Sequence, residues 1–389
     1  MFQTTKQYVQ WQEDGAEQQA RWLSQSGYEV PKRIVIVDDT TTANEAYRLA
    51  NAGTSMLWRG DFHNAKQLLQ AITRRIDKAE KRKLSKVKAK LDNNSEPQQV
   101  LPNLFHQNRL AQAQRTRLLS RLLLQFEANF ELNLRRAPDV SAVCTAAFGE
   151  IDEPCVLSFR DLQGAISAAQ WRKKGVPINA LGVSIYPHYS VFAPTRQEYV
   201  QLLLDAPLPE RHDLALDIGT GTGLLSVILA KRGFVKIIAT DLNPRALACA
   251  QDNFQRLALS NIQLQQVDLF PKDAPLADLI VCNPPWLPAK PSSPLEYGVY
   301  DANSAMLRGF LAQAKQYLAE GGVIWLIMSD LAEHLNLRSR EQLLSWFDEA
   351  GLAVQYRLDT KPTHGKSQDA TDPLYVARQA EVTSLWCLQ

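Results

Sequence analysis

Three glycines alternate in the segment DIGTGTG, which follows a short apolar run and precedes the helical pattern LLSVILAKRG. Gly219, Gly221 and Gly223 permit a tight turn and let a ligand approach backbone N–H groups closely. A dinucleotide-binding loop has the spacing GxGxxG and would need a glycine where Leu224 stands. The spacing here is GxGxG, preceded by Asp217, and it predicts a different ligand-binding turn. A purely structural glycine-rich turn is the alternative.

Two more carboxylates end predicted strands after this turn. Asp241 lies 24 residues after Asp217 at the end of VKIIATD, where it can accept hydrogen bonds from both hydroxyls of a ribose. Asp268 ends IQLQQVD and can reach an adenine amino group or a neighbouring amide, with a helix or turn cap as the alternative. Three acids around this turn, without a phosphate-binding lysine, favour a nucleoside that carries positive charge and no phosphate. S-adenosylmethionine is such a ligand, because it has a sulfonium and an ammonium group.

A second motif interrupts the apolar run DLIVC with Asn283, Pro284, Pro285 and Trp286. Two consecutive prolines cannot continue the hydrogen-bond ladder of a strand. The motif follows the predicted fourth strand, beside the first, where open α/β sheets bind their ligands. Cys282 precedes the motif and is more typical of core packing than of a nucleophile.

Together, the two motifs and Asp241 resemble those of class I S-adenosylmethionine-dependent methyltransferases over residues 214–330. The tetrapeptide is similar to the Asn-Pro-Pro-aromatic motif of enzymes that methylate planar nitrogens. These enzymes include glutamine amide methyltransferases that act on release factors, and methyltransferases that act on exocyclic amines of adenine or guanine. The resemblance implies S-adenosylmethionine as the cofactor and the tetrapeptide as the catalytic motif.

Elementary chemistry explains the residue types in this motif. A planar NH2 group is a poor nucleophile because its lone pair is delocalised. The side-chain oxygen of Asn283 and the carbonyl of Pro284 can each accept one N–H, which fixes the nitrogen and favours its pyramidalisation. Trp286 offers a flat face for stacking. Thr195 and Arg196 lie in VFAPTRQEY, which is similar to a segment that the release-factor enzymes place over the cofactor. A helix-capping loop at a domain boundary is the alternative.

These motifs need a sheet whose strand ends meet at one edge. Residues 205–389 alternate β-rich runs with helical patterns, which predicts an α/β fold with a seven-stranded, doubly wound, Rossmann-like sheet. The polar linker DTKPTHGKSQDATDP joins the last two strands in place of a helix, so we expect an antiparallel final strand inserted into the sheet. Residues 138–204 are predicted as a connecting α/β segment with strand-like runs and one short helix.

Residues 1–137 are predicted as a basic, mostly helical substrate-recognition domain. After the β-branched run RIVIV, helical spacing predicts one long helix from Asp61 and a second over 104–134, separated by LDNNSEPQQ. Residues 74–90 hold nine Lys or Arg against two acids, and six arginines lie within 109–136. These charges indicate either an anionic partner such as RNA or DNA, or a solvated helix face.

The bulk composition is that of an ordinary globular protein, with 389 residues, 45% of them hydrophobic, and a formal net charge of +2. No apolar run approaches the length of a membrane span, and the first residues lack the pattern of a signal peptide. The five cysteines are scattered without metal-binding spacing, which is typical of reduced thiols in a cytoplasmic protein. The six histidines are equally scattered, so we expect no metal site.

The sequence therefore predicts an S-adenosylmethionine-dependent N-methyltransferase that acts on an exocyclic amine of a nucleic-acid base. Structured RNA is the favoured substrate, bound through the Lys/Arg-rich residues 74–90 and 109–136. Methylation of a protein glutamine amide is the alternative, because the same tetrapeptide serves both reactions. A non-catalytic module that binds nucleoside and RNA is a third hypothesis, which the intact tetrapeptide disfavours.

Overall fold

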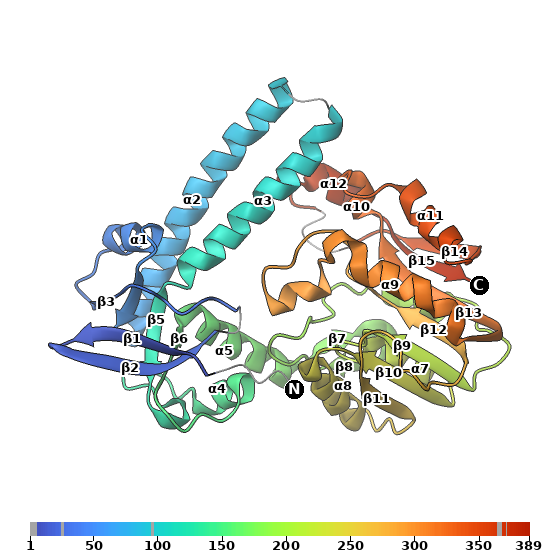
Figure 1. Cartoon of the computed structure of the whole chain (residues 1–389), viewed down its shortest axis with the longest axis horizontal. Coiled ribbons are helices and arrows are strands. Elements are labelled where there is room, and N and C mark those ends of the chain that lie inside the picture. The colour runs from blue at the N-terminus through green and yellow to red at the C-terminus, as the bar shows by residue number, and fades with distance from the viewer. Residues whose placement is uncertain (1–5, 25–26, 95–96, 364–367, 371) are drawn as a thin grey trace. The chain divides into compact units, whose positions relative to one another are not determined.

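The computed structural model describes residues 6–24, 27–94, 97–363, 368–370 and 372–389. The chain divides into two compact units, one comprising residues 1–96 and 103–170, the other residues 97–102 and 171–389. Figure 1 shows their elements.

The first unit contains a six-stranded mixed sheet in the order β1-β2-β6-β5-β4-β3. Its strands are β1 (Tyr8–Glu13), β2 (Ala16–Leu23), β3 (Ile34–Val37), β4 (Ser55–Trp58), β5 (Leu122–Phe126) and β6 (Cys155–Ser158). The helices of this part of the chain are α1 (Ala43–Asn51), α2 (Phe62–Asn94), α3 (Pro97–Leu119), α4 (Ser141–Phe148) and α5 (Phe159–Lys174). The strand predicted at RIVIV and the long helix after Asp61 are both confirmed.

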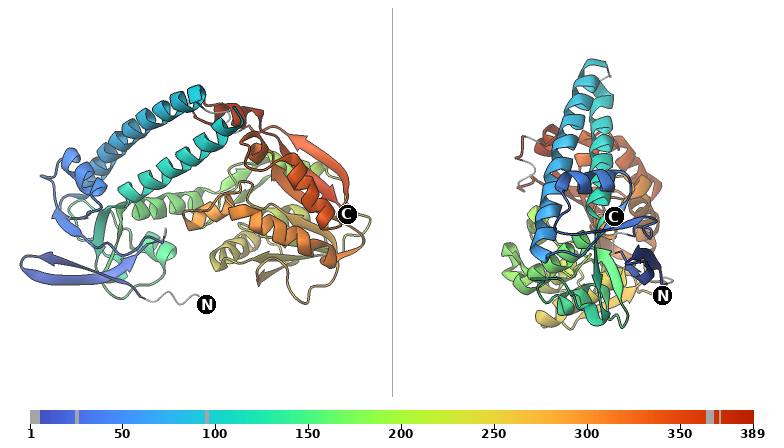
Figure 2. Two further views of the ribbon diagram at one scale, coloured as in Figure 1. Left: turned by 45° about the horizontal axis from the view of Figure 1, so that its top comes forward. Right: turned by 90° about the vertical axis from the view of Figure 1, so that its left-hand side faces the viewer.

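The apolar face of α2 forms part of this unit's core. Leu68, Leu69 and Ile72 pack into one buried cluster with Trp58 of β4 and Leu124 of β5. Figures 1 and 2 show the part of α3 from residue 103 onward running beside α2. An ion pair of 2.6 Å between Arg115 Nε and Asp77 Oδ1 joins the two helices.

The second long helix ends earlier than the sequence pattern predicted, and 104–134 is not one helix. α3 stops at Leu119, and Leu122–Phe126 forms strand β5. This strand pairs with β4 in parallel and with β6 in antiparallel orientation, and four of its five side chains are buried. Pairing on both sides therefore outweighs the helical preference of its leucines. The first unit also extends beyond residue 137 to Gln170, because β6 pairs with both β2 and β5.

The second unit contains the predicted seven-stranded sheet, in the order β11-β10-β9-β12-β13-β15-β14. Its strands are β9 (Leu214–Ile218), β10 (Lys236–Asp241), β11 (Ile262–Gln266), β12 (Ala277–Cys282), β13 (Leu318–Ser329), β14 (Val354–Thr360) and β15 (Thr383–Leu388). A separate pair is formed by β7 (Val176–Ile178) and β8 (Val183–Ile185). β15 runs antiparallel to both β13 and β14, which confirms the prediction of an inserted antiparallel final strand.

Helices cover both faces of this sheet. They are α6 (Glu198–Asp205), α7 (Leu224–Lys231), α8 (Pro244–Arg256), α9 (Ala305–Ala314), α10 (Leu331–His334), α11 (Arg340–Glu349) and α12 (Tyr375–Ala380). One buried cluster joins α6, α7 and α8 to Ala215 and Leu279, and another joins α9 and α11 to Leu216 and Ile280. Successive strand side chains point to opposite faces, so these clusters are the two layers of a doubly wound fold.

Among the described residues, no helix has the length and apolar character needed to cross a membrane. All five cysteines are buried and carry free thiols.

Candidate active site

The glycine-rich turn joins β9 to α7, and all three of its glycines have positive φ values: 76° at Gly219, 56° at Gly221 and 85° at Gly223. This left-handed region favours glycine because other residues clash there. A Cβ atom at Gly223 would lie 2.5 Å from the ring of Phe254, so this glycine also lets α7 pack against α8. A Cβ atom at Gly221 would meet nothing within 4 Å, so a ligand has room to approach the backbone there.

Asp217 is fully buried at the end of β9, beneath the turn. Its Oδ2 accepts hydrogen bonds from the hydroxyl groups of Thr220 and Ser226, both at 2.6 Å, and from the Ser226 N–H at 3.0 Å. Its Oδ1 has no hydrogen-bond partner among the described residues. Burial raises the pKa of Asp217 to about 6, and these hydrogen bonds oppose part of the rise. A buried acceptor without a donor is costly, so this oxygen is suited to a ligand donor.

Asp241 ends β10 and fixes the turn from the other side. Its Oδ2 accepts the N–H of Gly221 at 3.0 Å, and its Oδ1 accepts the N–H of Asn243 at 2.8 Å. Burial raises the pKa of Asp241, while these backbone hydrogen bonds lower it. Each carboxylate oxygen keeps a further lone pair, so the group can still accept hydrogen bonds from a ligand.

The other two predicted cofactor residues lie further out. Asp268 is exposed and follows the last residue of β11 by two positions. Thr195 is exposed in the loop before α6, and its N–H donates to the Ala193 carbonyl at 2.8 Å. Among the described residues, neither side chain forms a hydrogen bond with Asp217 or Asp241. Their contact with a cofactor stays a prediction.

The Asn-Pro-Pro-Trp motif follows β12, which pairs in parallel with β9, so the motif and the glycine-rich turn lie at the same edge of the sheet. Trp286 Nε1 donates to Asn283 Oδ1 at 2.9 Å and to the Ile327 carbonyl at 3.2 Å. The Asn283 side chain also hydrogen-bonds Tyr199, which opposes part of the rise that burial causes in the Tyr199 pKa. Cys282 is fully buried, and burial raises the pKa of its thiol far above the ordinary value. This thiol is therefore suited to packing.

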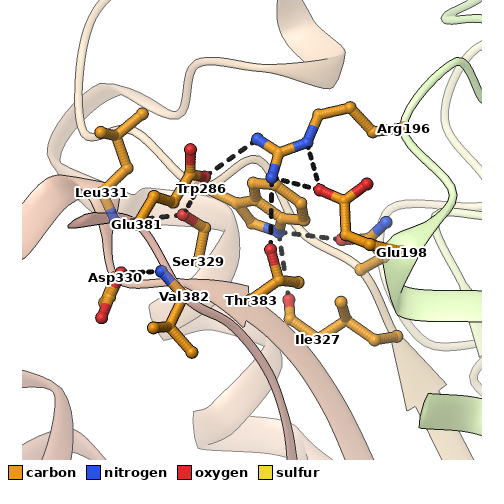
Figure 3. A network of polar contacts seen from close by, with 11 residues as sticks. Arg196, Glu198, Trp286, Ile327, Ser329, Asp330, Leu331, Glu381, Val382 and Thr383 are labelled. Atoms are coloured by element: carbon orange, nitrogen blue, oxygen red, sulfur yellow. Dashed lines mark hydrogen bonds and ion pairs between the residues drawn. The ribbon is translucent and has the colours of Figure 1, made fainter. Parts of the chain in front are cut away.

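Arg196 lies over the indole of Trp286, with its guanidinium carbon 4.7 Å from the ring centroid (Figure 3). It donates to Glu198 at 2.7 Å, to Glu381 at 2.9 Å and to Thr383 at 3.2 Å. The hydroxyl of Ser329 also donates to Glu381. Figure 3 shows how this network joins the loop before α6 to the end of β13 and the start of β15. One face of Trp286 is thus covered by a residue of the chain itself.

Two buried residues of this site were not predicted from the sequence. The Asn253 side chain donates to the Thr222 carbonyl at 3.0 Å and accepts the Tyr186 N–H at 2.8 Å, which braces the glycine-rich turn. Glu381 is fully buried and binds Arg196. Each had a sequence signal, because Asn253 is a polar residue on the apolar face of α8 and Glu381 is an acid that opens an apolar strand run.

Comparison with known proteins places these motifs in a family. The profile of the methyltransferase small domain matches residues 182–349. A Methanocaldococcus jannaschii protein named "Putative protein N5-glutamine methyltransferase" is 32% identical over 157 residues, which are 39% of this chain and 78% of that protein.

Two further relatives match over shorter stretches. A tRNA1(Val) (adenine(37)-N6)-methyltransferase of Actinobacillus pleuropneumoniae is 36% identical over 150 residues, or 37% of this chain and 64% of the relative. The release factor glutamine methyltransferase of Escherichia coli is 44% identical over 87 residues, or 21% of this chain and 30% of the relative. The chain therefore spans less than two thirds of these two relatives.

The site fits the cofactor of that family. Asp217 Oδ1 offers a buried negative acceptor to an ammonium group, and the open backbone at Gly221 leaves room for a nucleoside. Asp241 stands at the end of the adjacent strand, where the resemblance puts the ribose. Sheet topology, site geometry and sequence similarity agree: the chain belongs to the class I S-adenosylmethionine-dependent methyltransferases.

Proposed function

We propose that this enzyme methylates a planar nitrogen, and that this nitrogen is the exocyclic amine of an RNA base. The position of Asn283 supports the proposal that the target is a planar nitrogen. It follows β12, the neighbour of β9, so its amide oxygen lies at the sheet edge that holds the glycine-rich turn. The indole N–H of Trp286 holds this amide by a hydrogen bond of 2.9 Å. Restricting its rotation in this way is what orientation of an acceptor group requires.

S-adenosylmethionine, when bound, supplies an electrophilic methyl group. Asn283 Oδ1 has two lone pairs, of which Trp286 uses one, so the second can accept an N–H from the substrate amine. The Pro284 carbonyl, held by the fixed φ of proline, can accept the other N–H. With both N–H groups held, the nitrogen lone pair would form the new N–C bond as the sulfonium–methyl bond breaks and its electron pair goes to sulfur. The surplus proton on nitrogen would then leave to water. This scheme needs no general base before transfer.

Trp286 acts in this scheme chiefly by orienting Asn283. Its indole N–H is shared between Asn283 and the Ile327 carbonyl, and Arg196 covers one face of its ring. Trp286 also packs against the buried clusters on both sides of the sheet, so orientation of Asn283 is better supported than stacking of a substrate base. A guanidinium over an indole is a favourable contact, so the ring is held in place before substrate arrives.

The RNA part of the proposal is supported by exposed cations on α2. They are Arg74, Lys78, Lys81, Arg82 and Lys83. The side chains of the same run from Lys86 to Lys90 lie outside the described residues. Within 109–136, in contrast, Arg115 pairs with Asp77, and both Arg135 and Arg136 pair with Asp61. Those three arginines have structural partners, so the α2 cations carry more of the support for a nucleic-acid substrate.

Labelled methyl transfer would test this function. Cells that lack this chain are extracted, and their RNA, DNA and protein fractions are incubated separately with the enzyme and S-adenosylmethionine that carries a labelled methyl group. We expect label in RNA, recovered as an N-methylated base after digestion to nucleosides. Label on carbon or oxygen atoms would contradict the role of Asn283, and label in protein alone would contradict the RNA substrate.

A protein glutamine amide is the second candidate substrate. The observation that favours it is the Methanocaldococcus jannaschii relative, because the match covers 78% of a protein named for glutamine methylation. A glutamine amide also presents a planar NH2 group, so Asn283 and Pro284 would hold it in the same way. In the experiment above, this candidate predicts label on a glutamine side chain in the protein fraction and none in RNA.

We also propose that the enzyme works in the cytoplasm. The support is that all five cysteines are buried free thiols, as expected for a protein of a reducing compartment. Export to an oxidising compartment with full activity would contradict this proposal.

A further inference from the structure

The first unit contains a cavity that lies outside the methyltransferase match, with a volume of about 540 Å3. It is formed between the loop that joins β2 to β3, the last turns of α3, and the starts of β4 and α5. This volume is within the range of pockets that hold a nucleotide-sized ligand. The cavity is therefore large enough to be a binding site in its own right.

Three guanidinium groups meet at this cavity: those of Arg33, Arg117 and Arg121. Arg121 is half-buried, and its pKa is lowered first by burial and then by the positive charges of Arg117 and Arg33. Arg33 donates a hydrogen bond to the Ala52 carbonyl at 2.5 Å, and Arg121 donates one to the Ser55 hydroxyl at 3.3 Å. Both acceptors are neutral. Like charges are thus held together without a neutralising carboxylate among these contacts.

Other arginines of the same unit form ion pairs with carboxylates. Arg59 lies 2.6 Å from Glu13, and Arg136 lies 2.6 Å from the buried Asp61. In the described part of the chain, none of the three cavity arginines forms an ion pair of this kind. Crowded cations of this sort stabilise an anion that binds between them, because each N–H then gains a charged acceptor.

The rest of the cavity lining is partly polar and partly aromatic. The hydroxyl groups of Ser55 and Ser120 add polar groups, and Trp22 and Tyr28 add aromatic surface. Trp22 Nε1 donates to the Tyr28 carbonyl at 3.0 Å, which holds the loop in place. Two acids, Glu29 and Asp161, also line the cavity.

These two acids do not cancel the positive charge. Burial raises the pKa of Asp161 to about 6, so part of its charge is lost in mildly acidic to neutral solution. Lys32 adds a fourth cation to the three arginines. Four cations against two acids leave the lining positive.

We propose that this cavity binds a backbone phosphate of the substrate RNA, with Arg33, Arg117 and Arg121 as the donors. The choice of RNA as the source of the phosphate rests on the proposed function. Arg117 follows Arg115 by two positions, and Arg115 is paired with Asp77 within the basic run of α2. The cavity and the exposed cations of α2 therefore belong to the same two helices, but they lie on different sides of α3, because residues two positions apart on a helix do not share a face.

The test uses the full chain and a short, fluorescently labelled single-stranded RNA. The double variant Arg117→Gln/Arg121→Gln should bind this RNA about tenfold more weakly at low salt. Its salt slope should fall by about 0.7, because one phosphate contact is lost. The matched control is Arg48→Gln/Lys66→Gln, which removes two exposed charges from helices of the same unit. We expect it to bind like the unaltered protein, and circular dichroism should show both variants folded.

Several results would overturn this proposal. An equal loss of affinity in both double variants would mean that net charge alone attracts RNA. Full competition by inorganic phosphate or a free nucleotide, at concentrations comparable to those of the RNA, would assign the cavity to a small phosphate ligand. Loss of binding to an acidic peptide, with RNA binding unchanged, would assign it to a protein partner.

The failure of this proposal and the failure of the proposed function are distinguishable. If cellular RNA is not methylated but the double variant still loses RNA binding, the proposed substrate is wrong and the phosphate site stands. If RNA is methylated and the double variant binds it normally, the function stands and the phosphate site is refuted.

Discussion

The two halves of the proposed active site are built in different ways. The half assigned to the methyl donor is local, because its contacts lie within one β-α-β unit. Asp241 accepts the N–H groups of Gly221 and Asn243. Asp217 accepts hydrogen bonds from Thr220 and Ser226. The half that receives the acceptor depends on distant partners. Trp286 donates a hydrogen bond to Asn283, and the guanidinium of Arg196 lies over the Trp286 ring. Arg196 in turn binds Glu381, which is 185 residues away in the sequence.

This difference predicts which substitutions should disturb each half. Backbone hydrogen bonds and positive φ values fix the donor half, so changes elsewhere in the chain should disturb it little. The acceptor half relies on a partly buried charge network, whose members depend on each other in a non-additive way. Substitutions should therefore separate donor binding from methyl transfer.

The largest effect is expected at Asn283. Asn283→Ala should lower the single-turnover transfer rate by about a hundredfold or more, because one oriented acceptor of the amine N–H is lost. Affinity for S-adenosylmethionine, measured by calorimetry, should stay within a few-fold of normal. Transfer at the normal rate would show that the tetrapeptide merely ends a strand, and it would remove the support for nitrogen methylation.

Asp241→Ala should act on the donor half alone. We expect S-adenosylmethionine binding to weaken by about 2 to 3 kcal/mol, because a charged acceptor and the Gly221 contact disappear together. Calorimetry measures the loss directly, and saturating cofactor should restore most of the transfer rate. Unchanged affinity would mean that the end of β10 does not face the cofactor.

Arg196→Lys should act on the acceptor half from a distance. Lysine keeps the charge beside Glu198 and Glu381 but loses the planar group that covers Trp286 and binds Thr383 as well. We expect the transfer rate to fall by about tenfold with cofactor affinity unchanged. Arg211→Lys, at an exposed pair with Asp213, is the matched control. An equal fall in both variants, or a loss of cofactor affinity, would contradict the separation of the two halves.

The smallest expected effect concerns pH and Asp217. Its pKa of about 6 lies above the ordinary value of 3.8, so the folded chain holds this proton more tightly than the unfolded chain does. This contribution to the free energy of unfolding is complete below about pH 4 and is lost as pH rises through about 6. The ionised form binds an ammonium group better, so S-adenosylmethionine affinity should rise about fourfold between about pH 5.5 and 7, by roughly the change in ionised fraction.

Asp217→Asn separates the two consequences. Calorimetry across this pH range should show weak cofactor binding without the rise, and thermal unfolding should lose the corresponding pH dependence. If the variant keeps the same rise in affinity, another group is responsible for it.

The donor half could be predicted from the sequence because its signals are local. Alternating glycines, an acid at the end of each of two strands and the short apolar runs of β9 and β10 all lie within a short stretch. The inserted position of β15 was also predictable, since a polar linker without a helix precedes it. The acceptor half was predicted only at its motif. Nothing in spacing links Arg196 to Glu381, and only the fold brings them together.

In the first unit, the sequence pattern predicted the wrong structure for one segment. Leucine-rich residues after α3 keep a helical period, but β5 pairs with a strand on each side, so long-range pairing decides its structure. The arginines within 109–136 also differ in ways that composition does not reveal. Arg135 and Arg136 bind the buried Asp61, whereas Arg117 and Arg121 line a cavity.

The insertion of β15 between β13 and β14 has a consequence for the order in which the enzyme is made. The donor half is synthesised before β12, β13, β14 and β15, because its residues come earlier in the chain. The facing edges of β13 and β14 must wait for β15, and with it come Glu381 and Thr383, which hold Arg196. The residues that hold Arg196 are therefore made last, after both the glycine-rich turn and the Asn-Pro-Pro-Trp motif.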